Sequence, residues 1–330
     1  MNRLDYTEEF MTGLQRGLQY WLDAWQQPAA GSALPPEHGH EQRLLHWAAF
    51  TRAFLPLAVD LALAMHPTML YTGQWIEWKT CLGSIAAASA DRVDADRQFH
   101  LLHYLADVCF RRGDLNEAIA WAEQVIFLAR AAQEQAQAAI AVNLLAEIYL
   151  AAEDYRLAQD YAQQGLALIN AASSKHRQAD AYINAARACL GAAVTAAGGL
   201  EAVEQQPLTA EHTRTVEEWL QQALALALAA DNATYQAKAH LFLHHTLAVR
   251  GAWAQALGHA QTALSLVESY GDDAGRGVVL QAVGRSLAGL SRRAEAIEAL
   301  QSAMRIHEHH GNRLAQQNTQ RRLEKLLQVN

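Results

Sequence analysis

The sequence predicts an all-α protein built from helical hairpins that repeat along the chain. The composition is rich in alanine and leucine, with 51% hydrophobic residues and only six prolines in 330 residues, which favours helix throughout. Small residues recur at intervals of 40 residues, and turn residues recur between them. A chain of this length is long for one globular core but ordinary for an array whose units pack on their neighbours.

Two columns of mostly small residues define the repeat. The first reads Ala106, Ala146, Ala186, His244 and Gly284, and the second reads Ala118, Ala158, Val216, Ala256 and Ala296. Every step is 40 residues except one step of 58 in each column. The two long steps share only the interval from Ala186 to Val216, so one insertion in that interval explains both. Gly198, Gly199 and Pro207 lie there, so we expect an insertion at about 194–212 that protrudes or is disordered and carries little core.

The repeats divide the chain into three predicted parts. Residues 1–58 form an N-terminal helical segment: an amphipathic helix over 5–27, a loop over 28–40, and a helix from Glu41 that Pro56 kinks or breaks. Residues 59–310 form the repeat array, with turns such as Gly113-Asp114-Leu115 between the arms. The period also reaches Gly73 upstream and Leu323 downstream. Residues 311–330 form a capping helix with a polar outer face.

The hairpin motifs resemble the tetratricopeptide repeat family. The segments that resemble the family's core motif are Leu105-Ala106…Gly113-Asp114-Leu115-Asn116-Glu117-Ala118 and Leu144-Leu145-Ala146…Tyr149…Asp154-Tyr155…Ala158. The family repeats every 34 residues or so, whereas this chain uses 40, and the usual terminal proline is absent. The 40-residue form and the segment Gly73-Gln74-Trp75-Ile76-Glu77-Trp78 resemble the sensor arms of STAND signalling NTPases. The resemblance covers about residues 60–328 and implies a right-handed superhelical solenoid.

The resemblance also implies a concave ligand-binding groove lined by the first helix of each hairpin. Projecting the period onto that face gives twelve candidate residues that combine amides, charges and aromatic rings. They are His103, Tyr104, Asp107, Phe110, Asn143, Glu147, Asn184, Arg187, Phe242, His245, Gln281 and Arg285. Such side chains can bracket a peptide or a protein segment. The expected partner is therefore a protein or peptide, with an NTPase or effector domain or subunit as a further candidate.

No catalytic or nucleotide-binding motif accompanies the repeats. The chain lacks Gly-x-x-x-x-Gly-Lys-Ser/Thr, Gly-x-Ser-x-Gly and His-Glu-x-x-His, so we expect a binding module rather than an enzyme, with no cofactor. The closely spaced histidines are His240 and His244, then His307, His309 and His310. We expect the first pair to pack between hairpins and the trio to stabilise a helix end, rather than to bind metal, because a third convergent ligand is not evident.

The net charge and the cysteine content narrow the expected class of partner and the expected cellular compartment. The net charge of −8 argues against nucleic acid as a partner, although residues 285–325 hold eight Arg and Lys against four Asp and Glu. That basic end could hold a peptide carboxylate or an acidic partner. Three cysteines without metal-ligand spacing and the absence of a long apolar run lead us to expect a soluble cytoplasmic protein without a membrane partner.

Three functions remain open from the sequence. The first is a peptide-binding scaffold or sensor arm of a STAND-type signalling or defence system. The second is a stand-alone peptide-pheromone receptor in which residues 1–60 contact an effector. The third, of a different class, is a metal-dependent hydrolase that uses the histidine clusters.

Overall fold

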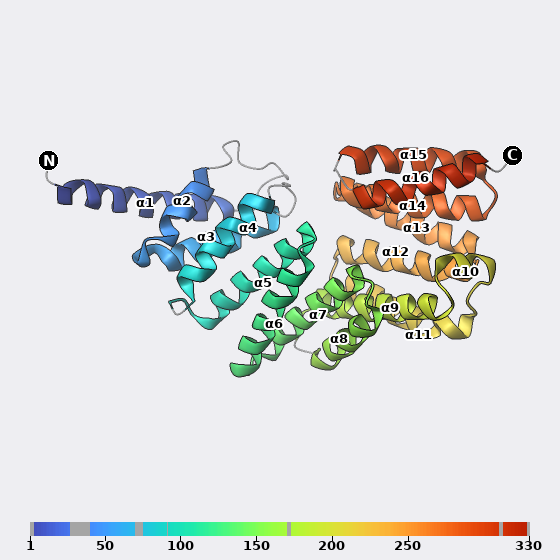
Figure 1. Ribbon diagram of the computed structural model, residues 1–330, viewed down its shortest axis with the longest axis horizontal. Coiled ribbons are helices and arrows are strands. Elements are labelled where there is room, and N and C mark those ends of the chain that lie inside the picture. The colour runs from blue at the N-terminus through green and yellow to red at the C-terminus, as the bar shows by residue number, and fades with distance from the viewer. Residues whose placement is uncertain are drawn as a thin grey trace. The chain divides into compact units, whose positions relative to one another are not determined.

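The computed structural model describes residues 3–26, 40–69, 75–90, 92–169, 173–309 and 313–328, and these are helices joined by turns, without strands (Figure 1). The all-α prediction is confirmed. The chain divides into two compact units, residues 1–148 and 149–330, which are described separately. Most of the predicted loop over 28–40, the positions Gly73 and Gln74, the inter-repeat turns at Asn170 and Gly311-Asn312, and His310 lie outside the described residues.

Unit 1 begins with a bundle that leads into the first hairpins. Its elements are α1 (Arg3–Gln26), α2 (His40–Ala49), a 3-10 turn (Arg52–Phe54), α3 (Leu55–Met69), α4 (Trp75–Ser89), α5 (Ala95–Arg112), α6 (Leu115–Ala131) and most of α7 (Gln135–Ala151). Helices α1 to α4 pack around Leu18, Leu45 and Trp78, and α5 and α6 form a hairpin. Pro56 breaks the predicted helix in two, as it occupies the first turn of α3, where proline costs no hydrogen bond.

Unit 2 continues the hairpins. Its helices are α8 (Tyr155–Leu168), α9 (Lys175–Ala196), α10 (Leu200–Gln205), α11 (Ala210–Ala229), α12 (Ala233–Val249), α13 (Trp253–Ser269), α14 (Asp273–Gly289), α15 (Arg293–His309) and α16 (Arg313–Gln328). The hairpins are α9 with α11, α12 with α13, and α14 with α15. Their first arms, which we call the first-arm helices, pack in the order α9, α12, α14, and α16 packs against α14 and α15.

The two residue columns have physical roles. All five members of the second column are buried, so the arms approach closely over them. Between the arms the chain turns through a left-handed residue, which satisfies the last carbonyls of the first helix. In the described hairpins whose arms follow each other directly, these residues, with their φ angles, are Gly113 at 85°, Glu153 at 59°, Gly251 at 71° and Ser291 at 60°. Only two are glycine, so the position in the repeat decides this conformation.

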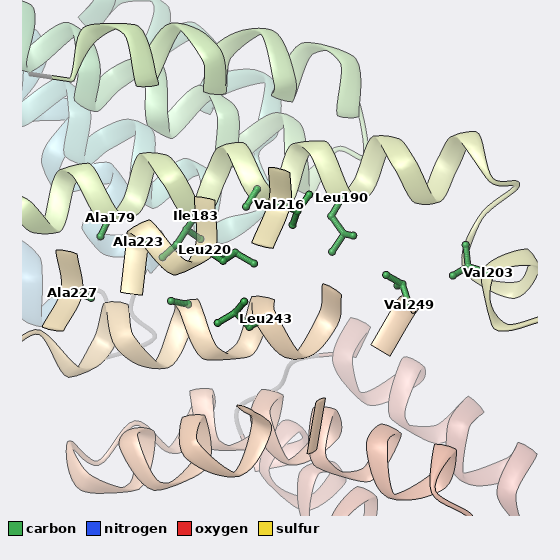
Figure 2. Packing of buried hydrophobic residues seen from close by; sticks show 12 residues of the cluster. Ala179, Ile183, Leu190, Val203, Val216, Leu220, Ala223, Ala227, Leu243 and Val249 are labelled. Atoms are coloured by element: carbon green, nitrogen blue, oxygen red, sulfur yellow. The ribbon is translucent and has the colours of Figure 1, made fainter. Parts of the chain in front are cut away.

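The insertion differs from the expectation. Between the two arms α9 and α11 lie α10 and its flanking turns. Its packing is not that of a disordered or protruding loop: Val203 is only 2% exposed and belongs to the same core cluster as Leu190 and Val249 (Figure 2). The Leu208 N–H also donates to the Val249 carbonyl at 3.0 Å. The excursion therefore adds a small layer to the unit 2 core, because its few apolar residues face α9 and α12.

No single described helix is long and apolar enough to cross a membrane. A bent pair, His40–Ala49 with Arg52–His66, passes on length and composition alone, with an angle of 118° between its halves.

Candidate functional site

In unit 1, two candidate residues take part in a buried polar cluster around His66. The Trp78 indole N–H donates to His66 Nδ1 at 3.2 Å, and Tyr104 stacks on the imidazole with centroids 3.7 Å apart. His66 Nε2 lies 3.6 Å from an Asp107 carboxylate oxygen, and the Arg111 Nε donates to the same carboxylate. Since Nδ1 accepts from the indole, the ring proton resides on Nε2, facing Asp107. The cluster joins α3, α4 and α5.

The charges in this cluster follow from its burial. Burial lowers the pKa of His66, with Asp107 opposing the change only in part, so a neutral imidazole is favoured at pH 7. Burial alone would raise the pKa of Asp107, but the hydrogen bond from His66 and the charges of Arg111, His66 and His103 lower it to about 2. Tyr104 and Asp107 thus have partners within the unit. They connect helices there, whatever else they contact.

The other unit 1 candidates lie on α5 and α7 at half-buried or buried positions. His103, Phe110 and Glu147 are half-buried, and Asn143 is 9% exposed. Asn143 is therefore closer to the core than a solvated groove residue would be.

In unit 2, three candidate residues form a connected chain. The Arg187 guanidinium donates to Asn184 Oδ1 at 3.2 Å and lies over the Phe242 ring, 4.9 Å from its centroid. The Phe242 ring in turn lies 5.6 Å from that of His245. Asn184 is fully buried, which corrects the expectation that it lies outside the hairpin core. Its Nδ2 group finds no hydrogen-bond partner in the part of the chain that the structure describes.

Hydrogen bonds of His244 and Gln281 fix the register of α12, α14 and α16. His244, fully buried, has Nδ1 3.2 Å from Ser286 Oγ and 3.3 Å from the Ala256 carbonyl, which joins α12 to α14 and to α13. The Gln281 amide donates to Thr319 Oγ1 at 3.0 Å, which joins α14 to α16. The interpretation that His244 packs between hairpins is confirmed. Gln281 is likewise engaged within the unit.

Several arginine side chains lie close to these hydrogen-bonded helices. Burial and, to a lesser extent, the charge of the neighbouring Arg322 together lower the pKa of Arg285 to about 10, with the charge of Glu204 opposing them. Burial also lowers the pKa of His245 well below its usual value, and the charges of Arg285, Arg322 and Arg187 act in the same direction. The Arg285 guanidinium lies 5.9 Å from the Trp253 ring centroid, and its buried Nε has no partner among the described residues.

Acidic groups near these arginines come from the insertion. Glu204 of α10 lies 4.0 Å from the Arg322 guanidinium, and Glu201 lies 3.9 Å from Lys325 Nζ. Sequence reasoning missed Arg322 and Glu204, because it placed Arg322 on a solvated cap and Glu204 in a loop. The signal available was the excess of basic residues over 285–325.

The histidines are distributed differently from a metal site. His240 pairs with His259 of α13, Nδ1 to Nδ1 at 2.9 Å, rather than with His244. His307 is buried against Gly277, and His309 is exposed. Within the described ranges no group of three or more His, Cys, Asp or Glu side chains could hold a metal ion. A surface hollow of about 440 Å³ lies elsewhere, between α15 and α16, and contains none of the candidate residues.

Comparisons with known proteins agree with this architecture. Residues 97–171 match the sequence profile described as tetratricopeptide repeat. No curated protein matches the chain significantly. Because all solved structures reported below are at most 12% identical, they show the fold alone.

Three solved structures align with most of this chain. A Rap protein complexed with competence and sporulation factor aligns with a TM-score of 0.62 at 12% identity, over 92% of this chain and 80% of that one. Aspartyl phosphate phosphatase F from Bacillus subtilis aligns at 0.54 and 10% identity, over 87% and 74%. A STAND protein with a tetratricopeptide repeat sensor from Pyrococcus horikoshii aligns at 0.54 and 12% identity, over 89% of this chain but only 46% of that one.

Proposed function

We propose that this chain, a helical-repeat protein with tetratricopeptide repeats at residues 97–171, recognises a peptide or protein segment on its first-arm helices and acts by binding rather than by catalysis. The observation that carries the proposal is the set of donors in unit 2. The half-buried guanidinium groups of Arg187 and Arg285 lie on α9 and α14, on either side of Phe242 and His245 of α12, and Arg285 Nε has no partner among the described residues. A donor without an acceptor costs free energy, which a ligand with carbonyl or carboxylate oxygens would recover.

The solved structures of similar fold support a sensing role. One is a Rap protein in complex with competence and sporulation factor, and another carries a tetratricopeptide repeat sensor within a longer STAND protein. We therefore propose that the chain works as a sensor module, either as the arm of a signalling or defence NTPase or as a stand-alone peptide-responsive regulator. Three free cysteines agree with a cytoplasmic setting.

A stand-alone regulator would also need a surface that contacts its effector, and the N-terminal bundle would have to provide it. Phe10 of α1 and Trp47 of α2 are exposed and meet edge to face with centroids 5.9 Å apart, and Phe50 is exposed beside them. If the chain regulates an effector by itself, replacing Trp47 should weaken effector binding without altering peptide binding. If it is a sensor arm, the NTPase partner should be captured with the chain instead.

The proposal is tested by selecting ligands from a displayed peptide library on the full chain and measuring their affinity by calorimetry. Arg187→Gln should weaken the selected peptides at least about tenfold, as one charge-assisted contact is removed. This variant is preferable to a change at Asn184, whose full burial would confound binding with folding.

The matched control is Arg156→Gln on α8, whose guanidinium is exposed and pairs only loosely with Asp160 at 3.7 Å. It should leave affinity unchanged. If the library yields no ligand, or if the control weakens binding while Arg187→Gln does not, the assignment of this face is wrong.

A further inference from the structure

One position of the repeat changes sign between the two units. It follows the first small-residue column by one residue, on the first helix of each hairpin and on α16. Its successive occupants are Asp107, Glu147, Arg187, His245, Arg285 and Lys325. The two acids belong to unit 1, and the four basic or imidazole side chains belong to unit 2.

The structure of unit 2 keeps these four positions in line. They lie on α9, α12, α14 and α16, which pack in that order. The hydrogen bond between His244 and Ser286 sets His245 beside Arg285, because each is one residue from a bonded partner. The hydrogen bond from Gln281 to Thr319 aligns α14 with α16 one helical turn earlier. Arg285 follows Gln281 by four residues and Arg322 follows Thr319 by three, so the two arginines lie at the same level.

We define the basic ladder as Arg187, His245, Arg285, Arg322 and Lys325, of which His245 is neutral at pH 7, because burial and the neighbouring charges lower its pKa. Two of its members have acidic neighbours from the insertion: Glu204 approaches Arg322 at 4.0 Å, and Glu201 approaches the exposed Lys325 at 3.9 Å. Arg285 has no such carboxylate within bonding distance among the described residues, and its Nε is buried. Desolvated guanidinium groups near one another are unfavourable unless an anion joins them. Arginine also offers the planar fork that matches a carboxylate.

We propose that the basic ladder binds an acidic segment of the peptide ligand, and that Glu204 occupies the anion position near Arg322 until the ligand arrives. This inference rests on the proposed function and names its ligand class. Neighbouring helices lie about 8 to 10 Å apart, and an extended chain advances about 3.3 Å per residue. Acidic residues at intervals of three along the ligand would therefore meet successive members of the ladder.

An acidic peptide fits better than a nucleic acid. The whole chain has a net charge of −8 and only four lysines, whereas binding to a phosphate backbone draws on a broad basic surface. The insertion also places two carboxylates beside the ladder, which a few spaced carboxylates of a peptide can avoid more easily than a continuous row of phosphates.

The test measures fluorescence anisotropy of labelled peptides with the full chain at low salt. The probe is a twelve-residue peptide of repeated Glu-Ala-Ala, compared with its Gln-Ala-Ala counterpart and with a twelve-nucleotide oligothymidine. We expect the acidic peptide to bind at least about tenfold more tightly than the other two, and its affinity to fall as salt rises.

The variants are chosen so that misfolding cannot imitate the result. Arg285→Gln and Arg322→Gln should each weaken the acidic peptide at least about fivefold, whereas Glu204→Gln should strengthen it by removing the competing charge. The control Arg156→Gln should change nothing. A Glu204→Gln variant that binds more weakly, equal binding of the neutral peptide, or tighter binding of oligothymidine would each overturn the proposal.

Failure here is distinguishable from failure of the proposed function. If library peptides that depend on Arg187 prove neutral and are insensitive to Arg285→Gln and Arg322→Gln, peptide recognition stands and the acidic specificity is refuted. If neither the library nor the acidic probe yields binding, both are refuted.

Discussion

His244 provides a quantitative prediction about acid stability. Its side chain is fully buried, and burial is the largest cause that lowers its pKa from 6.5 to about 4, with the charge of Arg285 acting in the same direction and the bond to the Ala256 carbonyl opposing it. The unfolded chain accepts a proton on this imidazole below pH 6.5, but the folded chain does not until about pH 4. Stability from this group is therefore fully present above pH 6.5 and is lost as pH falls.

The magnitude follows from the two pKa values. Between pH 7 and pH 5 the unfolded state gains proton binding at His244 that the folded state cannot match, worth about 2 kcal/mol of unfolding free energy. Other histidines with lowered pKa values, such as His66 and His245, add to the loss in the wild type. The prediction therefore concerns the difference between the wild type and His244→Asn, whose amide can still donate to the Ala256 carbonyl.

The assay is hydrogen exchange of α12 and α14 amides, together with urea unfolding, at pH 7 and pH 5. His244→Asn should be less stable than the wild type at pH 7, yet its loss on acidification should be smaller by about 2 kcal/mol. His46→Asn, which replaces an exposed ring of α2, is the control and should lose as much as the wild type. An equal loss in wild type and His244→Asn would refute the reasoning that burial keeps this imidazole neutral.

Two further predictions concern packing. Ala118→Leu and Ala158→Leu should each lower the free energy of unfolding by about 1 to 3 kcal/mol, because both alanines are fully buried between arms. Urea titration measures this change, and wild-type stability in both variants would show that the arms do not meet there. Val203→Ala should lower the free energy of unfolding by about 1 to 2 kcal/mol, and excision of the insertion should lower it further, because Val203 belongs to the unit 2 core. If excision shifts the melting midpoint by only a few degrees, the insertion is a dispensable loop after all.

The sequence alone determined the helical class and the hairpin period. These features are local or periodic: small residues mark close approach, and the turn positions recur at one place in each repeat. The cap positions are local as well. Asp94, Asp154, Asn232 and Asp272 each accept a hydrogen bond from the backbone three residues on, as short polar side chains do at helix starts.

Only the tertiary structure decided which polar residues are engaged with one another. Periodicity placed Asp107 and Asn184 on the same face of their helices, but it could not show that one meets His66 and Arg111 or that the other is fully buried beside Arg187. Likewise, no local signal in residues 194–212 shows that Val203 reaches the core or that Glu204 reaches Arg322. Burial and charge pairing depend on distances between segments far apart in the chain, and a repeat pattern fixes only the spacing within it.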